Sequence, residues 1–277
     1  MQNAGLAALG LDWQYLAFEV APEDLPAAIK GAQALRFIGL NLTVPHKVQA
    51  LALVDELAPC ARQWSAVNTI RFEARGADGA WQPLSRFVEP PAPPIRAVGF
   101  NTDADAMVLA LRRDLGVTVA GARVLLLGTG GAGRTAALKL AGEGVAELFL
   151  VNRTIARAQS LAREIAGAFP EIAVRVGYPP DRIDLLLNAT SLGLQRGDPL
   201  PFDAARFELR RAASVFDMVY RPAETRLLNE ARAAGCRGAN GLGMLLYQGA
   251  AALELWSGQP APLAVMRRAL EREVGRA

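Results

Sequence analysis

The stretch Arg123-Val-Leu-Leu-Leu-Gly-Thr-Gly-Gly-Ala-Gly133 decides the fold of this chain. Its first five residues form a short apolar run, which is typical of a parallel strand buried on both faces. The glycines follow at once with the spacing G-x-G-x-x-G, and we predict a helix directly after them. Strand, glycine loop and helix in this order are the setting in which the motif binds a dinucleotide. The stretch therefore predicts a Rossmann-type α/β domain.

Each glycine of this loop has a separate predicted role. Gly128 makes the tight turn, Gly130 removes a Cβ where a pyrophosphate approaches the backbone, and Gly133 lets the helix pack closely on the strand. The helix then directs free N–H groups and its positive dipole end at the phosphates. We predict that the cofactor contacts the whole loop, which comprises Gly128, Thr129, Gly130, Gly131, Ala132 and Gly133. The alternative is a glycine-rich turn with no ligand.

The end of the next predicted strand, residues 148–151, indicates which dinucleotide binds. Asn152-Arg153-Thr154 follows this strand, and Arg157 comes one helical turn later. An NAD site would carry an acidic residue here for the ribose 2′-hydroxyl, and this chain has none at that position. Two guanidinium groups are suited to bind a 2′-phosphate, so the sequence favours NADP. The alternative places both arginines on a solvated face.

Composition restricts the class of protein. The 277 residues are 52% hydrophobic and 21% charged, which is typical of a globular protein long enough for two domains. We find no apolar run of the ~18 residues that span a bilayer and no signal peptide, so we expect no membrane contact. Two isolated cysteines, Cys60 and Cys236, suit a reducing cytoplasm. The basic residues form no cluster, which argues against a nucleic-acid partner, and one histidine with two cysteines makes a metal site unexpected.

Strand-like and helix-like segments alternate through the first hundred residues, which predicts a mostly parallel sheet flanked by helices. The predicted strands are residues 13–20, 37–44, 66–72 and 97–100, and the predicted helices are 25–35, 46–57 and 104–115. Residues 75–96 are rich in proline and glycine and should form a surface excursion. We expect residues 1–104 and 240–277 to form an N-terminal α/β substrate domain. We expect residues 105–239 to form a C-terminal, Rossmann-type dinucleotide-binding domain.

Polar residues lie next to the predicted strands, and ligands bind at the carboxyl ends of strands in open α/β sheets. Lys47, Asn68 and Asp103 are such residues in the first domain, and Thr190 and Tyr220 in the second. A lysine with an aspartate suits proton transfer coupled to hydride transfer, because an alcohol that loses hydride must also lose its hydroxyl proton. Lys47 would exchange that proton and Asp103 would hold the amine, or Asp103 would itself be the proximal acid and base. The alternative is an ordinary salt bridge between domains.

For two further polar residues we predict different roles, one structural and one in ligand binding. His46 follows a proline at a predicted helix start, where packing or capping is common, so we assign it a structural role. Gln248 lies in an apolar helical run from Gly241 to Trp256, where a buried amide needs hydrogen-bond partners. A polyhydroxylated ligand would supply them.

These motifs together resemble the shikimate dehydrogenase family, over residues 3–260. The motifs are Asn41-Leu-Thr-Val-Pro-His-Lys47, Ala66-Val-Asn-Thr69, Asn101-Thr-Asp103, the glycine loop, Asn152-Arg-Thr154, Asn188-Ala-Thr-Ser191, Asp217-Met-Val-Tyr220 and Gly241-Leu-Gly-Met-Leu-Leu-Tyr-Gln248. The resemblance implies NADP-dependent interconversion of 3-dehydroshikimate and shikimate, in aromatic amino-acid biosynthesis. A related dehydrogenase that uses quinate is an alternative within the same resemblance.

The resemblance also implies roles for single residues. Lys47 and Asp103 match the catalytic pair of the family. The substrate-contacting positions are matched by Thr43, Asn68, Tyr220 and Gln248. The cofactor positions beyond the glycine loop are matched by Asn152, Arg153, Thr154, Arg157, Thr190, Met218 and Gly241, of which Met218 and Gly241 lie beside the nicotinamide. A homodimer is a further expectation.

Two departures from the family pattern generate further expectations. The segment between Asn68 and Asp103 is longer than usual, by about the proline-rich excursion. Met1-Gln2-Asn3 matches a point already inside the first helix of the family, so the preceding strand and a serine-rich turn for the substrate carboxylate have no counterpart. We expect either a misassigned start or a truncated form with impaired substrate binding. A protein that binds NADP without turnover is the corresponding alternative function.

Overall fold

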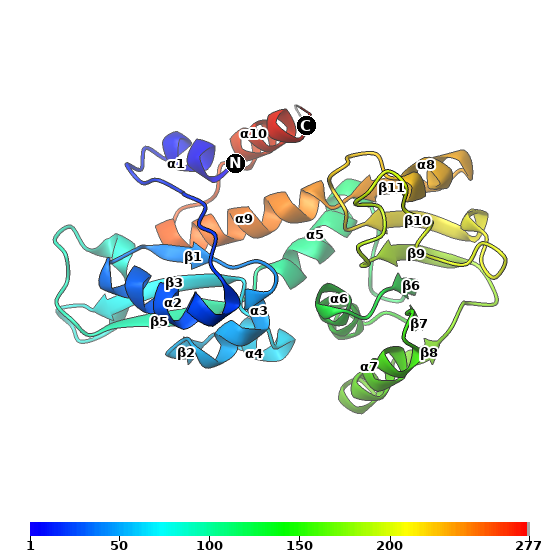
Figure 1. Cartoon of the computed structure of the whole chain (residues 1–277), viewed down its shortest axis with the longest axis horizontal. Coiled ribbons are helices and arrows are strands. Elements are labelled where there is room, and N and C mark those ends of the chain that lie inside the picture. The colour runs from blue at the N-terminus through cyan, green and yellow to red at the C-terminus, as the bar shows by residue number, and fades with distance from the viewer. Residues whose placement is uncertain (276–277) are drawn as a thin grey trace. The chain divides into compact units, whose positions relative to one another are not determined.

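The computed structural model describes residues 1–275, which fold as two compact units (Figure 1). Unit 1 comprises Met1–Asp103 and Gln248–Leu270, and unit 2 comprises Ala104–Tyr247 and residues 271–275. Three helices, α5 (Asp103–Leu115), α9 (Leu242–Ser257) and α10 (Leu263–Gly275), each contain a unit boundary. The domain limits expected from the sequence, 1–104 with 240–277 and 105–239, stay a prediction.

Unit 2 contains a six-stranded sheet in the order β11-β10-β9-β6-β7-β8, and all its neighbouring strands are parallel. The strands are β6 (Arg123–Leu127), β7 (Glu147–Val151), β8 (Ala173–Val176), β9 (Ile183–Asn188), β10 (Ala212–Asp217) and β11 (Arg237–Asn240). The helices α6 (Gly131–Gly142), α7 (Ile155–Ala168) and α8 (Arg226–Ala233) connect them (Figure 1). The predicted Rossmann-type domain, with a helix directly after the glycine loop, is confirmed.

The central strand of unit 2 is apolar because it is buried on both faces. Val124, Leu125, Leu126 and Leu127 of β6 are all 0% exposed. Helices cover both faces of a parallel sheet, so side chains of both orientations along the strand enter a core. One such core joins Leu125 and Leu127 to side chains of β9, β10 and α8, including Leu186, Val215 and Leu228.

Unit 1 contains a mostly antiparallel sheet, which corrects the prediction of a mostly parallel one. Its strands are β1 (Gly39–Asn41), β2 (Glu56–Leu57), β3 (Thr69–Arg75), β4 (Trp81–Pro83) and β5 (Ile95–Phe100). They lie in the order β1-β3-β5-β2, with β4 also paired to β3, and only the pair β2 and β5 is parallel. The reason is the excursion at residues 75–96, which returns the chain through a hairpin instead of a crossover helix.

Three other predicted elements of unit 1 differ from the structure. Residues 13–20 belong to no strand, and Leu16 and Phe18 are more than half exposed. The predicted helix 46–57 is only α3 (His46–Gln49), followed by a 3-10 turn at Ala50–Ala52. The predicted strand 37–44 contains only β1. Strand propensity depends on cross-strand partners, and a local pattern does not show whether such partners exist.

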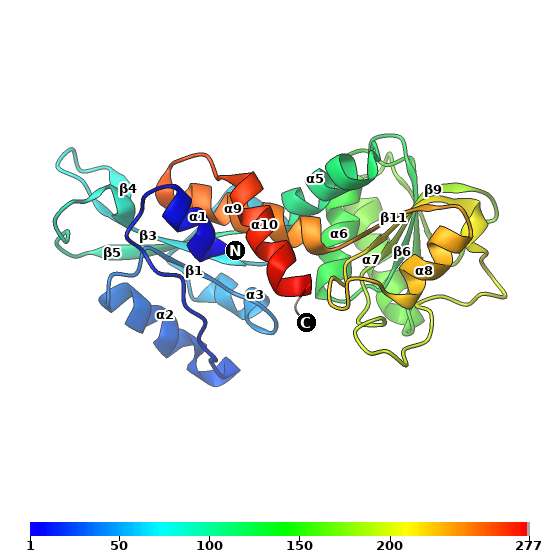
Figure 2. The ribbon, with the colours of Figure 1, turned by 90° about the horizontal axis from the view of Figure 1, so that it is seen from above.

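Helices cover both faces of the sheet of unit 1. The face toward α2 (Leu25–Ala34) buries Ile29, Ile70 and Phe72 in one core. The part of α9 that belongs to unit 1 lies on the other face, where Trp256 Nε1 donates a 3.0 Å hydrogen bond to the Ile70 carbonyl (Figure 2). A Cβ at Gly39 would overlap this indole, so glycine is required there.

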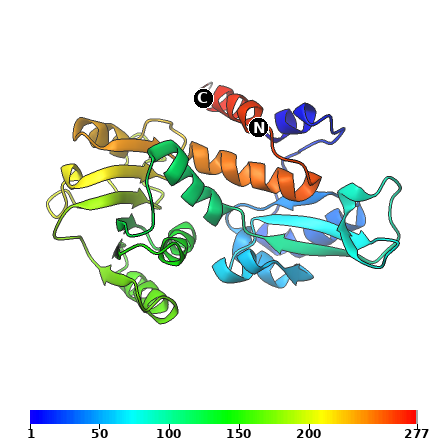
Figure 3. The same ribbon diagram turned by 180° about the vertical axis from the view of Figure 1, so that it is seen from behind.

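Figure 3 shows the same layers from behind. The remaining helices of this region are α1 (Gln2–Ala8), α4 (Pro59–Trp64) and α10 (Leu263–Gly275).

No helix within residues 1–275 combines the length and the apolar character that crossing a bilayer requires.

The hydrogen bond of Trp256 gives a stability prediction for unit 1. Trp256→Phe keeps an aromatic ring but leaves the buried Ile70 carbonyl without its donor, which should lower the free energy of unfolding by about 1–3 kcal/mol. Urea denaturation followed by circular dichroism measures this. The matched control is Trp81→Phe, because Trp81 is half-buried and its ring stacks between the guanidinium groups of Arg75 and Arg96. Equal midpoints for wild type and Trp256→Phe would contradict the role of this bond.

Candidate active site

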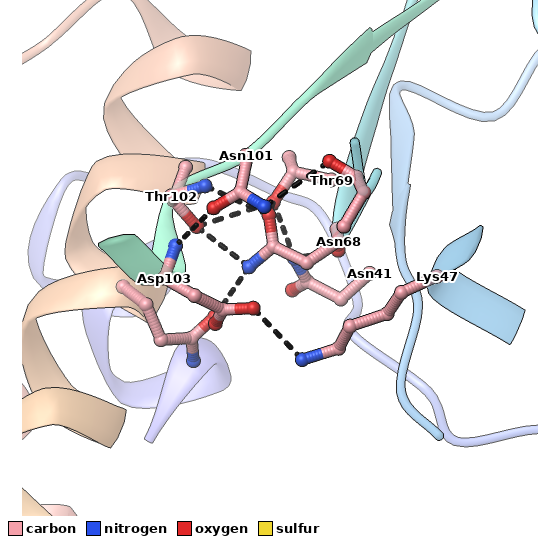
Figure 4. A network of polar contacts seen from close by, with 9 residues as sticks. Asn41, Lys47, Asn68, Thr69, Asn101, Thr102 and Asp103 are labelled. Carbon is pink, nitrogen blue, oxygen red and sulfur yellow. Dashed lines mark hydrogen bonds and ion pairs between the residues drawn. The ribbon is translucent and has the colours of Figure 1, made fainter. Parts of the chain in front are cut away.

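A lysine and an aspartate form an ion pair in unit 1. Lys47 lies on α3 and Asp103 begins α5, and Lys47 Nζ lies 2.8 Å from Asp103 Oδ2 (Figure 4). The side chains are 30% and 16% exposed, so solvent and small molecules can reach the pair. Asn101 positions the aspartate, because its Oδ1 accepts a 3.1 Å hydrogen bond from the Asp103 backbone N–H. The two residues that the sequence selected for proton transfer are therefore in direct contact.

Asn68 is the centre of a buried polar cluster beside this pair (Figure 4). Its Nδ2 donates to Thr102 Oγ1 at 2.9 Å and to Gln248 Oε1 at 3.5 Å. Its Oδ1 accepts from the Thr102 backbone N–H at 2.8 Å. These bonds fix the orientation of the amide, and they bring Asn68 and Gln248 together as expected for residues that share one ligand.

The sheet corrects the position that the sequence assigned to Asn68. Asn68 directly precedes β3 and Thr69 begins it, so neither residue follows the end of a strand. Asn41 ends β1 and Phe100 ends β5, and both pair with Thr69 in the antiparallel register. The cluster therefore forms where two strands end and the strand between them begins.

Two members of the cluster were missed by the sequence analysis. Asn41 Nδ2 donates to Thr69 Oγ1 at 3.0 Å, and Tyr15 donates its hydroxyl to Asn41 Oδ1 at 3.0 Å. Partial burial raises the pKa of the Tyr15 phenol. Asn41 lies inside a quoted motif, so a signal existed for it, whereas the residues around Tyr15 were mistaken for a strand.

Three other candidates of the sequence analysis have different surroundings. Thr43 is exposed, and its carbonyl accepts a 2.9 Å hydrogen bond from the His46 N–H. The His46 side chain is buried, and within residues 1–275 its Nδ1 has no hydrogen-bond partner. Tyr220 belongs to unit 2 and is 37% exposed.

The glycine loop of unit 2 has the geometry that a dinucleotide requires. Gly128 has a φ of +92°, a conformation that favours glycine. A Cβ at Gly133 would overlap the Gly128 carbonyl oxygen, so only glycine allows α6 to begin this close to β6. A Cβ at Gly130 or Gly131 would meet nothing within 4 Å, which leaves their backbone open to a ligand at the first turn of α6.

Two side chains around the loop indicate where a cofactor fits. Asn152 Oδ1 accepts a 3.1 Å hydrogen bond from the Thr129 N–H, so the end of β7 holds the loop. The Thr129 side chain is 9% exposed, and its Oγ1 has no hydrogen-bond partner among residues 1–275. Buried hydroxyls are rarely left unpaired, so this orphan atom beside an open backbone fits the phosphates of a dinucleotide.

The residues after β7 are exposed. Arg153, Thr154 and Arg157 all lie on the surface, and the Arg157 N–H donates a 3.1 Å hydrogen bond to the Thr154 carbonyl. Asn152 Nδ2 donates to the same carbonyl at 2.9 Å. The turn is thus held by its backbone, and the two guanidinium groups remain available for an anion.

The remaining cofactor candidates, Thr190, Met218 and Gly241, follow the ends of β9, β10 and β11 in unit 2. Thr190 Oγ1 donates a 2.7 Å hydrogen bond to Asn188 Oδ1. A Cβ at Gly241 would overlap the Met218 carbonyl oxygen, so this glycine permits a close approach of two backbone segments.

Comparison with known proteins identifies the family. The shikimate dehydrogenase substrate binding domain matches residues 1–70, the shikimate / quinate 5-dehydrogenase family matches residues 110–177, and the shikimate 5'-dehydrogenase C-terminal domain matches residues 241–271. The shikimate dehydrogenase (NADP(+)) of Geobacter metallireducens is 41% identical over 97% of this chain and 89% of that protein. The chain belongs to the shikimate dehydrogenase family.

Solved structures agree with this assignment. Shikimate 5-dehydrogenase of Thermus thermophilus, in complex with NADP(H) and shikimate, has a TM-score of 0.78 and 35% identity, over 98% of this chain and 92% of that one. Quinate dehydrogenase of Corynebacterium glutamicum, in complex with NAD, has a TM-score of 0.79 and 29% identity, over 98% and 92%. The family resemblance and the two-part α/β fold expected from the motifs are confirmed.

The loop glycines give a matched pair of predictions. Gly130→Ala should leave the unfolding free energy nearly unchanged, because the new methyl group meets open space, but should weaken dinucleotide binding where the phosphates approach. Gly133→Ala should lower the unfolding free energy by about 1–3 kcal/mol, because its methyl group overlaps backbone. Thermal unfolding without ligand and fluorescence titration with NADPH measure the two effects. Loss of stability in Gly130→Ala would contradict the open loop.

Proposed function

We propose that this protein catalyses the NADP-dependent interconversion of 3-dehydroshikimate and shikimate. The proposal rests on the 2.8 Å contact between Lys47 Nζ and Asp103 Oδ2, in a chain of the shikimate dehydrogenase family. The contact lies beside a cluster of hydrogen-bonding side chains suited to a polyhydroxylated ring.

The reaction requires one proton transfer for each hydride transfer. When bound, NADP⁺ would supply the acceptor for the hydride that leaves the carbon of the secondary alcohol, and NADPH would supply the hydride for the opposite direction. In the oxidative direction Lys47, as the free amine, takes the proton from the substrate hydroxyl and releases it to solvent. In the reductive direction the protonated amine donates its proton to the oxygen that was the carbonyl. General acid–base catalysis of this kind contributes about 10²–10⁴-fold in rate.

Asp103 orients the lysine in both directions. Its Oδ2 accepts a 2.8 Å hydrogen bond from Lys47 Nζ, which holds the amine in one orientation. The aspartate is itself held by Asn101 at the start of α5. The proton-exchanging nitrogen therefore has a fixed position before the substrate arrives.

Asn68 and Gln248 are proposed to bind the ring hydroxyls of the substrate. Their 3.5 Å contact is at the outer limit of a hydrogen bond, so a substrate hydroxyl can replace it at little cost. Thr102 holds the other side of Asn68 and keeps it in place. We also propose that Thr43 and Tyr220 contact the substrate, and this part of the proposal rests on the family pattern alone.

The cofactor is proposed to bind to unit 2. The open backbone at Gly130 and Gly131 and the unpaired Thr129 hydroxyl would hold the pyrophosphate. Arg153 and Arg157 would bind the 2′-phosphate, with Asn152 and Thr154 forming the turn that presents them. Thr190, Met218 and Gly241 would lie at the nicotinamide end.

A substrate comparison tests the proposed function. Purified protein with NADP⁺ should oxidise shikimate with a higher kcat/KM than quinate, as measured by NADPH absorbance. Preference for quinate would favour the alternative represented by the Corynebacterium glutamicum relative. Saturable NADPH binding without oxidation of either alcohol would identify an NADP-binding protein without turnover.

The proton-transfer role of Lys47 gives a kinetic prediction. Lys47→Ala should lower kcat by about 10²–10⁴-fold, because the group that exchanges the proton is lost. The Kd for NADPH should change little, because Lys47 belongs to unit 1. Lys30→Ala is the matched control, since Lys30 is an exposed lysine that donates a hydrogen bond to Gln33 on the same helix. Near-normal kcat in folded Lys47→Ala would remove Lys47 from the mechanism.

The turn after β7, which carries Arg153, gives a prediction for the choice between NADP and NAD. Hydrogen bonds to charged groups contribute about 1.5–3 kcal/mol each, so Arg153→Ala should weaken NADP binding about tenfold or more. Binding of NAD should barely change, because NAD lacks the 2′-phosphate. Arg163→Ala is the matched control, since Arg163 is an exposed arginine on the same helix as Arg157. Equal losses for NADP and NAD would show that Arg153 does not bind the phosphate.

Assembly and location complete the proposal. We propose a homodimer, which light scattering would test. We also propose a cytoplasmic location, on the basis of two free thiols, Cys60 and Cys236, which cell fractionation would test.

A further inference from the structure

We propose that Asp217 is a positioning residue for the dinucleotide site: through Asn188 it fixes Thr190 against the glycine loop. The inference rests on the proposed function, because it assumes that this loop binds NADP. Asp217, Asn188 and Leu127 end β10, β9 and β6, which are neighbours in the sheet. The proposed effect therefore passes across three adjacent strand ends within unit 2.

Asp217 is fully buried and accepts three hydrogen bonds from three different segments. Its Oδ1 accepts from Asn188 Nδ2 at 2.9 Å and from the Val219 backbone N–H at 3.1 Å. Its Oδ2 accepts from the Thr225 hydroxyl at 2.7 Å, and Thr225 caps the start of α8. One carboxylate thus joins β9, the turn after β10 and a helix start.

Asn188 transmits this position to Thr190. The amide is 0% exposed, and its Nδ2 donates to Asp217 and, at 3.1 Å, to the Leu192 carbonyl. Its Oδ1 accepts from the Thr190 backbone N–H at 3.0 Å and from the Thr190 hydroxyl at 2.7 Å. All donors and acceptors of the amide are used, so the amide has one orientation and the turn has one position.

Thr190 reaches the glycine loop. A Cβ at Gly128 would lie 2.8 Å from Thr190 Cγ2 and 3.1 Å from the Ala189 carbonyl, so this turn lies directly against the residue at φ +92°. A displaced Thr190 would give Gly128 a different neighbour and would alter the path of the loop toward Thr129 and Gly130. The position of Thr190 is therefore part of the geometry of the cofactor site.

The electrostatics of Asp217 argue for a role beyond stability. Within residues 1–275 no lysine or arginine forms an ion pair with this carboxylate, and burial raises its pKa. A buried carboxylate without a cation costs folding free energy, and hydrogen bonds offset only part of that cost. A residue that costs stability and fixes three segments suits a positioning role.

Binding measurements on the whole chain test the inference. Asp217→Ala should weaken NADPH binding by about threefold to thirtyfold, the usual range for residues that act through others. Asp217→Asn keeps an oxygen acceptor for Asn188 and Val219 and should restore the Kd to within about threefold of wild type. Fluorescence titration gives the Kd independently of turnover.

Two further variants separate positioning from general destabilisation. Thr225→Val removes the hydrogen bond on the α8 side of the same carboxylate, and it should lower the melting temperature while changing the Kd less than about twofold. Thr190→Val keeps the shape of the side chain and removes its hydroxyl bonds to Asn188 and Leu192. It should weaken NADPH binding by about threefold to thirtyfold, and it tests the inference even if Asp217→Ala does not fold.

A double variant decides whether the two residues act in series. If Asp217 acts through Thr190, Asp217→Ala with Thr190→Val should bind NADPH about as weakly as the weaker single variant. The inference would be overturned if the effects of the two single substitutions on the Kd for NADPH multiplied in the double variant. It would also be overturned if Thr190→Val bound NADPH with wild-type affinity, or if Thr225→Val lost as much affinity as Asp217→Ala. Failure of the wild-type protein to bind NADPH would instead overturn the proposed function.

Discussion

The approach of Gly133 to the Gly128 carbonyl is the constraint on which the cofactor site depends. It sets the start of α6 directly at the end of β6, and it is possible only because Gly133 has no side chain. The N-terminal end of the helix, where unpaired N–H groups favour an anion, is thereby placed at the open backbone of Gly130 and Gly131. The segments after the two neighbouring strands then hold this loop from both sides, through Asn152 after β7 and Thr190 after β9.

A different constraint organises unit 1: buried amides need complete hydrogen bonding. Asn68 is 2% exposed, and it is satisfied only because Thr102 and Gln248 come to it from other elements. The same strand ends place Lys47 and Asp103 in contact. Polar side chains that bind each other in this way are preorganised, so a substrate that replaces one of these contacts finds the others already in position.

The rule that ligands bind at carboxyl ends of strands selected residues that lie together in unit 1, although the sheet is mostly antiparallel. The physical reason is the register of three strands. β1 and β5 each run antiparallel to β3, so Asn41 and Phe100 end at the same edge where Thr69 begins. The prediction of a mostly parallel sheet was wrong, because the proline-rich residues 75–96 return the chain through a hairpin and not through a crossover helix.

The sequence by itself determined the dinucleotide loop, its helix, the buried strand before it and the residues of the Lys47–Asp103 pair, because these depend on local spacing and on residue type. Only the tertiary structure decided that residues 13–20 form no strand and that Asn41 and Tyr15 join the polar cluster. It alone placed Asp217, Asn188 and Thr190 in one chain of hydrogen bonds. Hydrogen bonds between residues far apart in sequence depend on strand order and register, which local patterns do not contain.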